Sequence, residues 1–102
     1  MAEVVYSERA LADLERLFEF LAETEPRAAA TAVAVIQDAI GILERHPLIG
    51  RSAEHGLREL VISRGRSGYL ALYDYLESID TILVLALRHQ RELGYAGDSE
   101  LS

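Results

Sequence analysis

A group of side chains that could bind or catalyse follows the last apolar run of the chain. Residues 82–87 are uninterrupted aliphatic residues, and behind them come Arg88, His89, Gln90, Arg91 and, a few residues later, Tyr95. An arginine can hold a carboxylate or a phosphate through two parallel hydrogen bonds, and a histidine can transfer protons near neutral pH. We therefore expect a buried strand that ends at the protein surface in a binding site or a proton-transfer site.

The composition is that of one small globular domain. Of the 102 residues, 50% are hydrophobic and 26% are charged, which excludes a disordered chain. We expect a single domain over residues 1–102, in which residues 89–102 form a flexible or partner-contacting tail. No uninterrupted apolar run approaches the roughly 20 residues that cross a bilayer, and the start lacks a basic, apolar signal, so we expect a cytoplasmic protein without a membrane span.

The charge of the chain is strongly uneven. The net charge is −7, but residues 45–69 carry five arginines against Glu54 and Glu59. An acidic protein is not attracted to nucleic acid in general, because such attraction comes mainly from neutralising phosphates. The absence of cysteine excludes disulfides and thiolate ligands, and three isolated histidines lack the spacing of a metal site, so we expect no metal and no cofactor.

Two amphipathic helices should position the site from one side. The first is predicted over residues 8–22, with Ser7 as the N-cap, and the second begins at Pro26 and ends at His46-Pro47. The predicted buried stripe of the first helix consists of Leu11, Leu14, Leu17, Phe18 and Leu21, and its predicted outer face of Asp13, Glu15, Arg16, Glu19 and Glu23. The predicted inner face of the second helix consists of Ala29, Ala32, Val33, Ile36, Ile40 and Leu43.

Four strands are predicted, over residues 4–6, 57–62, 69–76 and 81–88, with residues 48–56 as a loop. Short connections join the last three strands, which favours an antiparallel meander. The helices then have one sheet face to cover. The predicted fold class is α+β, with an antiparallel helical hairpin packed on a four-stranded, mainly antiparallel sheet.

Both faces of the last strands are apolar. Strict alternation places Leu83, Leu85 and Leu87 on one side and Ile82, Val84 and Ala86 on the other, and it places Tyr69, Tyr73 and Tyr75 on one face. The face away from the helices therefore needs a cover. The carboxy-terminal segment, a curved sheet edge or a protein partner could supply it.

The order of these elements, together with several short motifs, resembles the RelE/ParE toxins of bacterial type II toxin–antitoxin systems over nearly the whole chain. The motif residues are Pro47, Gly50 and Arg51; Leu57, Arg58, Glu59 and Leu60; Tyr69 and Tyr73; and Arg88, His89, Gln90 and Arg91. The resemblance implies the RelE/ParE-like fold, growth inhibition as the activity, and a hetero-oligomer with a cognate antitoxin protein. The motifs do not choose the branch of the superfamily.

One branch resembles ribosome-dependent mRNA endonucleases. Such cleavage needs a base, an acid and cations near the phosphate, and the candidates for catalysis are His89, Glu59, Arg58 and Tyr95, with Arg88 and Arg91 as further cations. Nucleases of this branch tend to be basic and to carry an arginine after the tyrosine of the third strand. This chain has Leu70 there and a net charge of −7, which counts against the nuclease.

The other branch resembles ParE, which inhibits DNA gyrase by binding it. This resemblance implies a binding protein more than an enzyme, with DNA gyrase as target and no direct sequence-specific binding of nucleic acid. The expected target-binding residues are Arg88, His89, Gln90, Arg91 and Tyr95, and the expected antitoxin-binding residues are Leu14, Leu17, Leu21, Tyr73 and Tyr75.

A third interpretation stays open, which is a binding module of the same fold without toxicity. Whatever the branch, several of these residues also have a structural interpretation. His89 can be a surface or capping histidine, and Arg64 and Arg66 in the 63–68 turn can be solvated or meet an acidic antitoxin tail. The three tyrosines of the third strand can serve only to pack the sheet.

Overall fold

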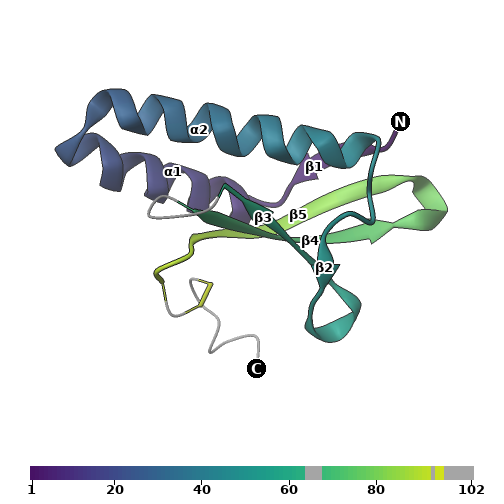
Figure 1. The fold of residues 1–102 in the computed structure, drawn as a ribbon. Coiled ribbons are helices and arrows are strands. Elements are labelled where there is room, and N and C mark those ends of the chain that lie inside the picture. The colour runs from purple at the N-terminus through teal and green to yellow at the C-terminus, as the bar shows by residue number, and fades with distance from the viewer. Residues whose placement is uncertain (64–67, 93, 96–102) are drawn as a thin grey trace.

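The computed structural model describes residues 1–63, 68–92, 94 and 95, and it confirms the predicted α+β fold (Figure 1). Two helices lie antiparallel across one face of a single sheet. The elements are β1 (Glu3–Tyr6), α1 (Glu8–Thr24), α2 (Pro26–Gly41), β2 (Arg51–Ser52), β3 (Arg58–Ile62), β4 (Tyr69–Leu76) and β5 (Thr81–His89), with short 3₁₀ turns at Ile42–Glu44, Glu54–Gly56 and Glu77–Ile79.

The sheet has five strands in the order β1-β5-β4-β3-β2, where four were predicted. The additional strand, β2, lies inside the predicted loop and pairs Arg51 with Glu59 and Ser52 with Arg58. Two residues are too short for any periodic pattern, so only the pairing with β3 reveals this strand. β1 runs parallel to β5, and the other neighbours are antiparallel.

The helix starts follow the local sequence. Ser7 has extended backbone angles, and its hydroxyl accepts the N–H of Ala10 at 3.0 Å, which confirms the predicted N-cap. Pro26 occupies the first turn of α2, where a missing N–H costs no hydrogen bond. α2 itself ends at Gly41, earlier than predicted, and the 3₁₀ turn carries the chain on to Glu44.

The buried stripe of α1 is rotated from the predicted one. Ala10, Asp13 and Leu17 are buried, whereas Leu11 and Phe18 are exposed. Asp13 was predicted on the acidic outer face, and its position three residues after Ala10 and four before Leu17 explains why it points inward. The predicted inner face of α2 fits better, because Ala29, Ile36, Ile40 and Leu43 are all buried.

A β-bulge changes which residues of β5 face the helices. Tyr73 pairs with Val84 and Leu72 pairs with Ala86, so Leu85 is an extra residue between them. As a result Ile82, Val84 and Leu87 pack together in the main core with the helices, while Ala86 packs on the opposite face. The prediction of strict alternation in this strand is therefore wrong beyond the bulge.

The opposite sheet face carries a small second core of Leu70, Ala86 and Tyr95, with Leu72 beside it. The chain after β5 passes to this face (Figure 1), so the carboxy-terminal segment covers part of it through Tyr95, which was one of the predicted alternatives. Within residues 89–102, the described part is held to the sheet, with the N–H of Gln90 donating to Gly68 O at 3.0 Å. Residues 93 and 96–102 of the predicted tail, and Arg64 and Arg66 of the predicted turn, lie outside the described residues.

One stretch, Pro26–Glu44, is apolar enough to cross a bilayer by length and composition alone, with a mean hydropathy of 1.2. Core helices of globular proteins share these properties. Here Ile36, Ile40 and Leu43 pack in the main core against the sheet, which accounts for the apolar composition of the helix.

Candidate functional site

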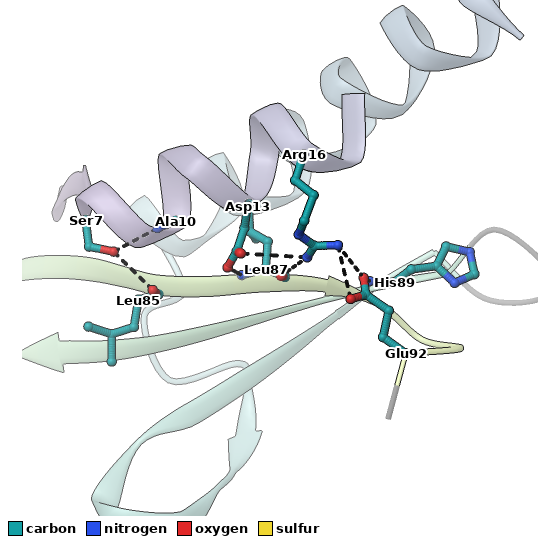
Figure 2. A network of polar contacts seen from close by, with 8 residues as sticks. All are labelled: Ser7, Ala10, Asp13, Arg16, Leu85, Leu87, His89 and Glu92. Atoms are coloured by element: carbon teal, nitrogen blue, oxygen red, sulfur yellow. Dashed lines mark hydrogen bonds and ion pairs between the residues drawn. The ribbon is translucent and has the colours of Figure 1, made fainter. Parts of the chain in front are cut away.

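The end of β5 is held by side chains of α1 where a neighbouring strand is missing (Figure 2). β1 ends opposite Val84, and within the described chain no strand continues along that edge of β5. Ser7 donates its backbone N–H to Val84 O at 2.9 Å and its hydroxyl to Leu85 O at 3.0 Å. The N–H of Leu87 donates to Asp13 Oδ2 at 2.9 Å. Polar groups of α1 and of its N-cap residue Ser7 thus substitute for a strand, and this sets the position of the Arg88–Arg91 segment.

Glu92 ties the residues after β5 to the same helix (Figure 2). Arg16 Nη1 lies 3.1 Å from both carboxylate oxygens of Glu92, and the other terminal nitrogen, Nη2, lies 3.7 Å from Asp13 Oδ1. The Glu92 carboxylate also accepts the N–H of His89 at 3.0 Å, and its backbone oxygen accepts Arg88 Nη1 at 2.8 Å. Sequence reasoning missed Asp13 and Glu92, although both determine where Arg88 and His89 lie.

A polar cluster lies on the open sheet face, away from the helices, and consists of Glu59, Tyr95, Arg51 and Arg88; we call it the Glu59 cluster. The Tyr95 hydroxyl donates to Glu59 Oε2 at 2.6 Å. Arg51 donates to Glu59 Oε1 from Nε at 2.9 Å and also from Nη2. The Arg88 guanidinium lies over the Tyr95 ring, 5.2 Å from its centroid, in a cation–π contact.

The environment of the cluster shifts the pKa values of Glu59 and Tyr95 in opposite directions. Burial raises the pKa of Glu59, but the hydrogen bonds from Tyr95 and Arg51 and the charges of Arg51 and Arg88 outweigh it, so the pKa lies below its usual value. Burial, and then the hydrogen bond to the Glu59 carboxylate, raise the pKa of Tyr95 far above its usual value. Near neutral pH the pair is therefore a charged carboxylate acceptor and a neutral phenol donor.

A hollow of about 470 Å³ opens beside the Glu59 cluster. It is lined by Arg51, Val61, Leu70, Arg88 and Gln90. Two guanidinium groups and an amide at one hollow can hold an anionic or amide-bearing partner. Of the predicted target residues, Arg88 and Gln90 line this hollow, and Tyr95 belongs to the cluster beside it.

A second concavity lies on the helix side of the same strand end, and we call it the α1 groove. It has a volume of about 590 Å³ and is lined by Arg16, Leu17, Phe20, Leu21, Tyr69, His89, Arg91 and Glu92. Phe20 is 70% exposed at this groove. His89 meets the Tyr69 ring edge-on, with the ring centroids 5.3 Å apart, and its Nδ1 accepts the N–H of Arg91 at 3.1 Å. The groove is mainly apolar, with charged groups at its rim.

The structure therefore divides the predicted target-binding residues between two faces. Arg88, Gln90 and Tyr95 belong to the open face, while His89 and Arg91 line the α1 groove. Alternation along the strand accounts for this, because Arg88 pairs with Leu70 and His89 with Tyr69.

The proposed RNA-cleaving set is divided in the same way. Glu59 and Tyr95 meet, but His89 lies in the α1 groove. Arg58 points to the opposite side of β3 from Glu59, and its Nη1 donates to Gly50 O at 2.8 Å and Leu48 O at 3.2 Å. Arg58 thus has a structural role in holding the loop before β2, and Arg51 takes the position beside Glu59.

The predicted antitoxin-binding residues have mixed positions. Leu17 and Tyr73 are buried in the main core, so a partner could reach little of either without opening it. Leu14, Leu21 and Tyr75 are half-buried, and the Tyr75 hydroxyl donates to Asp80 Oδ1 at 2.7 Å. Leu21 lines the α1 groove.

Among residues 1–63, 68–92, 94 and 95, no group of three histidine or acidic side chains is placed to hold a metal ion.

Comparison with known proteins identifies the family. Residues 4–94 match the model of the ParE toxin of type II toxin–antitoxin systems, parDE. The chain belongs to the RelE/ParE toxin superfamily. Two similar RelE/ParE relatives from Caulobacter vibrioides are Toxin RelE1, 39% identical over 75 residues that cover 74% of this chain and 81% of the relative, and Toxin RelE3, 32% identical over 92 residues that cover 90% and 98%.

Solved structures of RelE/ParE systems share the fold. The chromosomal ParDE system of P. aeruginosa matches with a TM-score of 0.74 and 22% identity, covering 87% of this chain and 96% of that one. The RelBE2 toxin–antitoxin complex of Mycobacterium tuberculosis matches with a TM-score of 0.58 and 28% identity, covering 87% and 98%. The prediction that this chain is the toxin of a type II toxin–antitoxin system is confirmed.

Proposed function

We propose that this toxin is a ParE-like inhibitor of DNA gyrase that acts by binding, without chemistry of its own. The observation that carries the proposal is the Glu59 cluster, in which Arg51 and Tyr95 both donate to a carboxylate. A charged carboxylate at this position repels a phosphodiester and occupies the groups that would bind it. The net charge of −7 and the match to the ParE model support the same conclusion.

The open sheet face is the proposed contact with the target. Arg88, Gln90 and Tyr95 lie there with Arg51, around the hollow beside Glu59. A protein surface that presents amides or backbone carbonyls, which the charge of Glu59 does not repel, fits this set of side chains. The toxin is proposed to act in the cytoplasm, where its target and its antitoxin would be present.

The α1 groove is the proposed contact with the antitoxin. A mainly apolar groove with Phe20 exposed on its wall suits the apolar face of an amphipathic segment, and Arg91 at the rim suits an acidic residue of that segment. Leu21 and His89 would take part as well, so this proposal assigns two of the predicted target residues, His89 and Arg91, to the antitoxin contact. Both solved relatives are named as toxin–antitoxin systems, which supports such a partner.

Ribosome-dependent mRNA cleavage is the second candidate. It is favoured by the geometry of Glu59 and Tyr95, because a charged carboxylate lies 2.6 Å from a neutral phenol beside a hollow lined by Arg51 and Arg88. These groups could supply the base, the proton donor and the cations of the reaction. In this case Glu59 would be a catalytic residue.

Two assays with one substitution separate these candidates. The purified chain is added to a gyrase supercoiling reaction and, in parallel, to ribosomes that translate a defined mRNA. Glu59→Gln keeps the size of the side chain and removes the base. For a binding inhibitor we expect gyrase inhibition to change by a few fold at most, whereas loss of a catalytic base lowers mRNA cleavage by about 100-fold or more. Glu54→Gln, an exposed carboxylate five residues earlier, is the matched control.

A chain that inhibits neither reaction, and still binds its antitoxin, would favour the third interpretation, the binding module without toxicity. Cleavage of mRNA by the wild type, with supercoiling unaffected, would refute the proposed gyrase inhibition.

A further inference from the structure

The loop between α2 and β2, residues 47–50, is held in one conformation by two side chains from the sheet. The Tyr73 hydroxyl donates to Pro47 O at 2.8 Å and accepts the N–H of Gly50 at 2.9 Å. Arg58 Nη1 donates to the carbonyl oxygens of Leu48 and Gly50 at 3.2 and 2.8 Å. The N–H of Ile49 donates to His46 O at 3.1 Å. Side chains of β3 and β4 therefore fix the backbone of this loop.

The side chains that this rigid loop carries point into solvent. Leu48 is 57% exposed and its neighbour Ile49 is 58% exposed. Because most polar backbone groups of the loop are already bonded, the loop offers a partner mainly its aliphatic side chains. Because the loop is already ordered, binding a partner that buries Leu48 and Ile49 does not cost the conformational entropy of ordering the loop.

Two exposed arginines of the described chain flank the loop, although the whole chain has a net charge of −7. Arg45 is exposed just before the loop, and Arg51 is exposed just after it. Arg51 also belongs to the Glu59 cluster, so the loop lies at the edge of the proposed target-binding face.

We propose that Leu48 and Ile49 are an apolar anchor through which this toxin contacts its protein target, and that the matching surface is an apolar pocket flanked by carboxylates. This inference rests on the proposed function, since it requires a toxin that acts by binding a protein. It adds a part of the surface, the residues 47–50 loop, that none of the sequence motifs marked as a contact.

Other occupants fit the loop less well. A symmetric dimer through this surface would bring the exposed arginines of two copies together, where their charges repel. A head-to-tail contact would leave an unpaired surface on each copy and would not form a closed dimer. Nucleic acid gains little from two aliphatic side chains, and the net charge of −7 opposes attraction to a polyanion. The antitoxin has its own apolar contact in the α1 groove.

The test uses the full chain with Leu48→Asp and Ile49→Asp combined. We expect about a tenfold or greater loss of both gyrase inhibition and growth inhibition, the size typical of removing an interface hot spot. The thermal midpoint and the antitoxin affinity should stay unchanged, since both side chains are exposed. Ile79→Asp, which alters an aliphatic residue 66% exposed at the β4–β5 turn, is the matched control and should leave toxicity intact.

Tyr73→Phe tests the role of the fixed loop conformation. The ring still fills the core, but the hydroxyl that bonds Pro47 and Gly50 is lost. We expect a partial loss of toxicity, about threefold, in a folded protein, because the target must then order the loop. Unchanged toxicity of this variant would refute the part of the proposal that concerns preorganisation.

Several results would overturn the anchor itself. These are full growth inhibition by the double variant, an equal loss of antitoxin binding, or a self-association of the wild type that the double variant abolishes. If the wild type arrests growth without inhibiting gyrase, the proposed function fails, and the growth assay with the same variants still decides the anchor. A wild type that neither arrests growth nor inhibits gyrase would overturn both.

Discussion

Replacing Asp13 tests whether a helix side chain substitutes for a missing strand. Asp13 is only 3% exposed, and its Oδ2 accepts the buried N–H of Leu87 at 2.9 Å. Asp13→Ala leaves that N–H without an acceptor beside a packed helix. The rest of the β5 edge keeps its bonds to Ser7, so the loss should be local to the end of the strand.

The expected size follows from the buried hydrogen bond. A buried donor that loses its partner costs about 1–3 kcal/mol, and a charged acceptor lies toward the upper end of this range. The contact of Asp13 with Arg16 adds little, because the Arg16 side chain is 40% exposed. We expect Asp13→Ala to lower the free energy of unfolding by about 2–3 kcal/mol, which corresponds to a fall in the melting temperature on the order of 10–20 °C.

Urea denaturation of the purified chain measures this loss, with an unchanged m-value as evidence that both proteins unfold in the same way. Asp13→Asn keeps an oxygen that can accept the Leu87 N–H and should lose only about 1 kcal/mol. Glu15→Ala, at an exposed position on the same helix, should stay within about 0.5 kcal/mol of the wild type. If Asp13→Ala also stayed within this margin, the inference that α1 takes the place of a strand along β5 would be wrong.

The remaining predictions concern three other sites. Gly50→Ala should destabilise the fold by about 1–3 kcal/mol in urea denaturation, because its Cβ would lie 2.6 Å from the Tyr73 hydroxyl oxygen and 3.0 Å from Glu59 O. The pKa of Glu59 is lower in the folded state, so its contribution to stability is present above the unfolded pKa of 4.5 and is lost as the pH falls through the folded pKa. Glu59→Gln should therefore weaken the dependence of the unfolding free energy on pH in the acidic range. Urea titrations from pH 6 to pH 3 would show this. Phe20→Asp should weaken antitoxin binding by about tenfold or more in calorimetry and leave gyrase inhibition unchanged.

Much of the fold could be predicted because the signals are local. The hydroxyl of Ser7 and the ring of Pro26 act within one helical turn, so the sequence alone indicates both helix starts. The predicted strand over residues 69–76 matches β4, because its apolar and aromatic residues end at a polar turn. Short connections then favour antiparallel pairing whatever the details of packing.

The features that sequence did not predict depend on contacts between distant residues. The bulge at Leu85 arises from the pairing of β5 with β4, and it reverses the faces of Ala86 and Leu87. Asp13 was assigned to solvent because it is charged, although its spacing from Ala10 and Leu17 places it on the buried stripe. A charged residue on an apolar stripe is a signal for a buried polar contact, and its partner, 74 residues away, is visible only in the structure.

The candidate site was predicted in part. The motif at Arg88–Arg91 lies beside both hollows of the candidate site, but the alternation of side chains distributes it over two faces. Arg51 belonged to a motif, yet its place beside Glu59 depends on β2, a strand of two residues. Long-range pairing thus decides which of the predicted side chains meet.

The most direct test of the central claim is a pulse-label comparison of DNA and protein synthesis just after the chain alone is induced in a bacterium without its antitoxin. Gyrase inhibition predicts that DNA synthesis falls first, and that co-expression of the antitoxin prevents the fall. The Glu59→Gln variant should behave like the wild type in this experiment. The account would be contradicted if protein synthesis fell first with the wild type and did not fall with the Glu59→Gln variant. That result would identify the Glu59 cluster as an RNA-cleaving site.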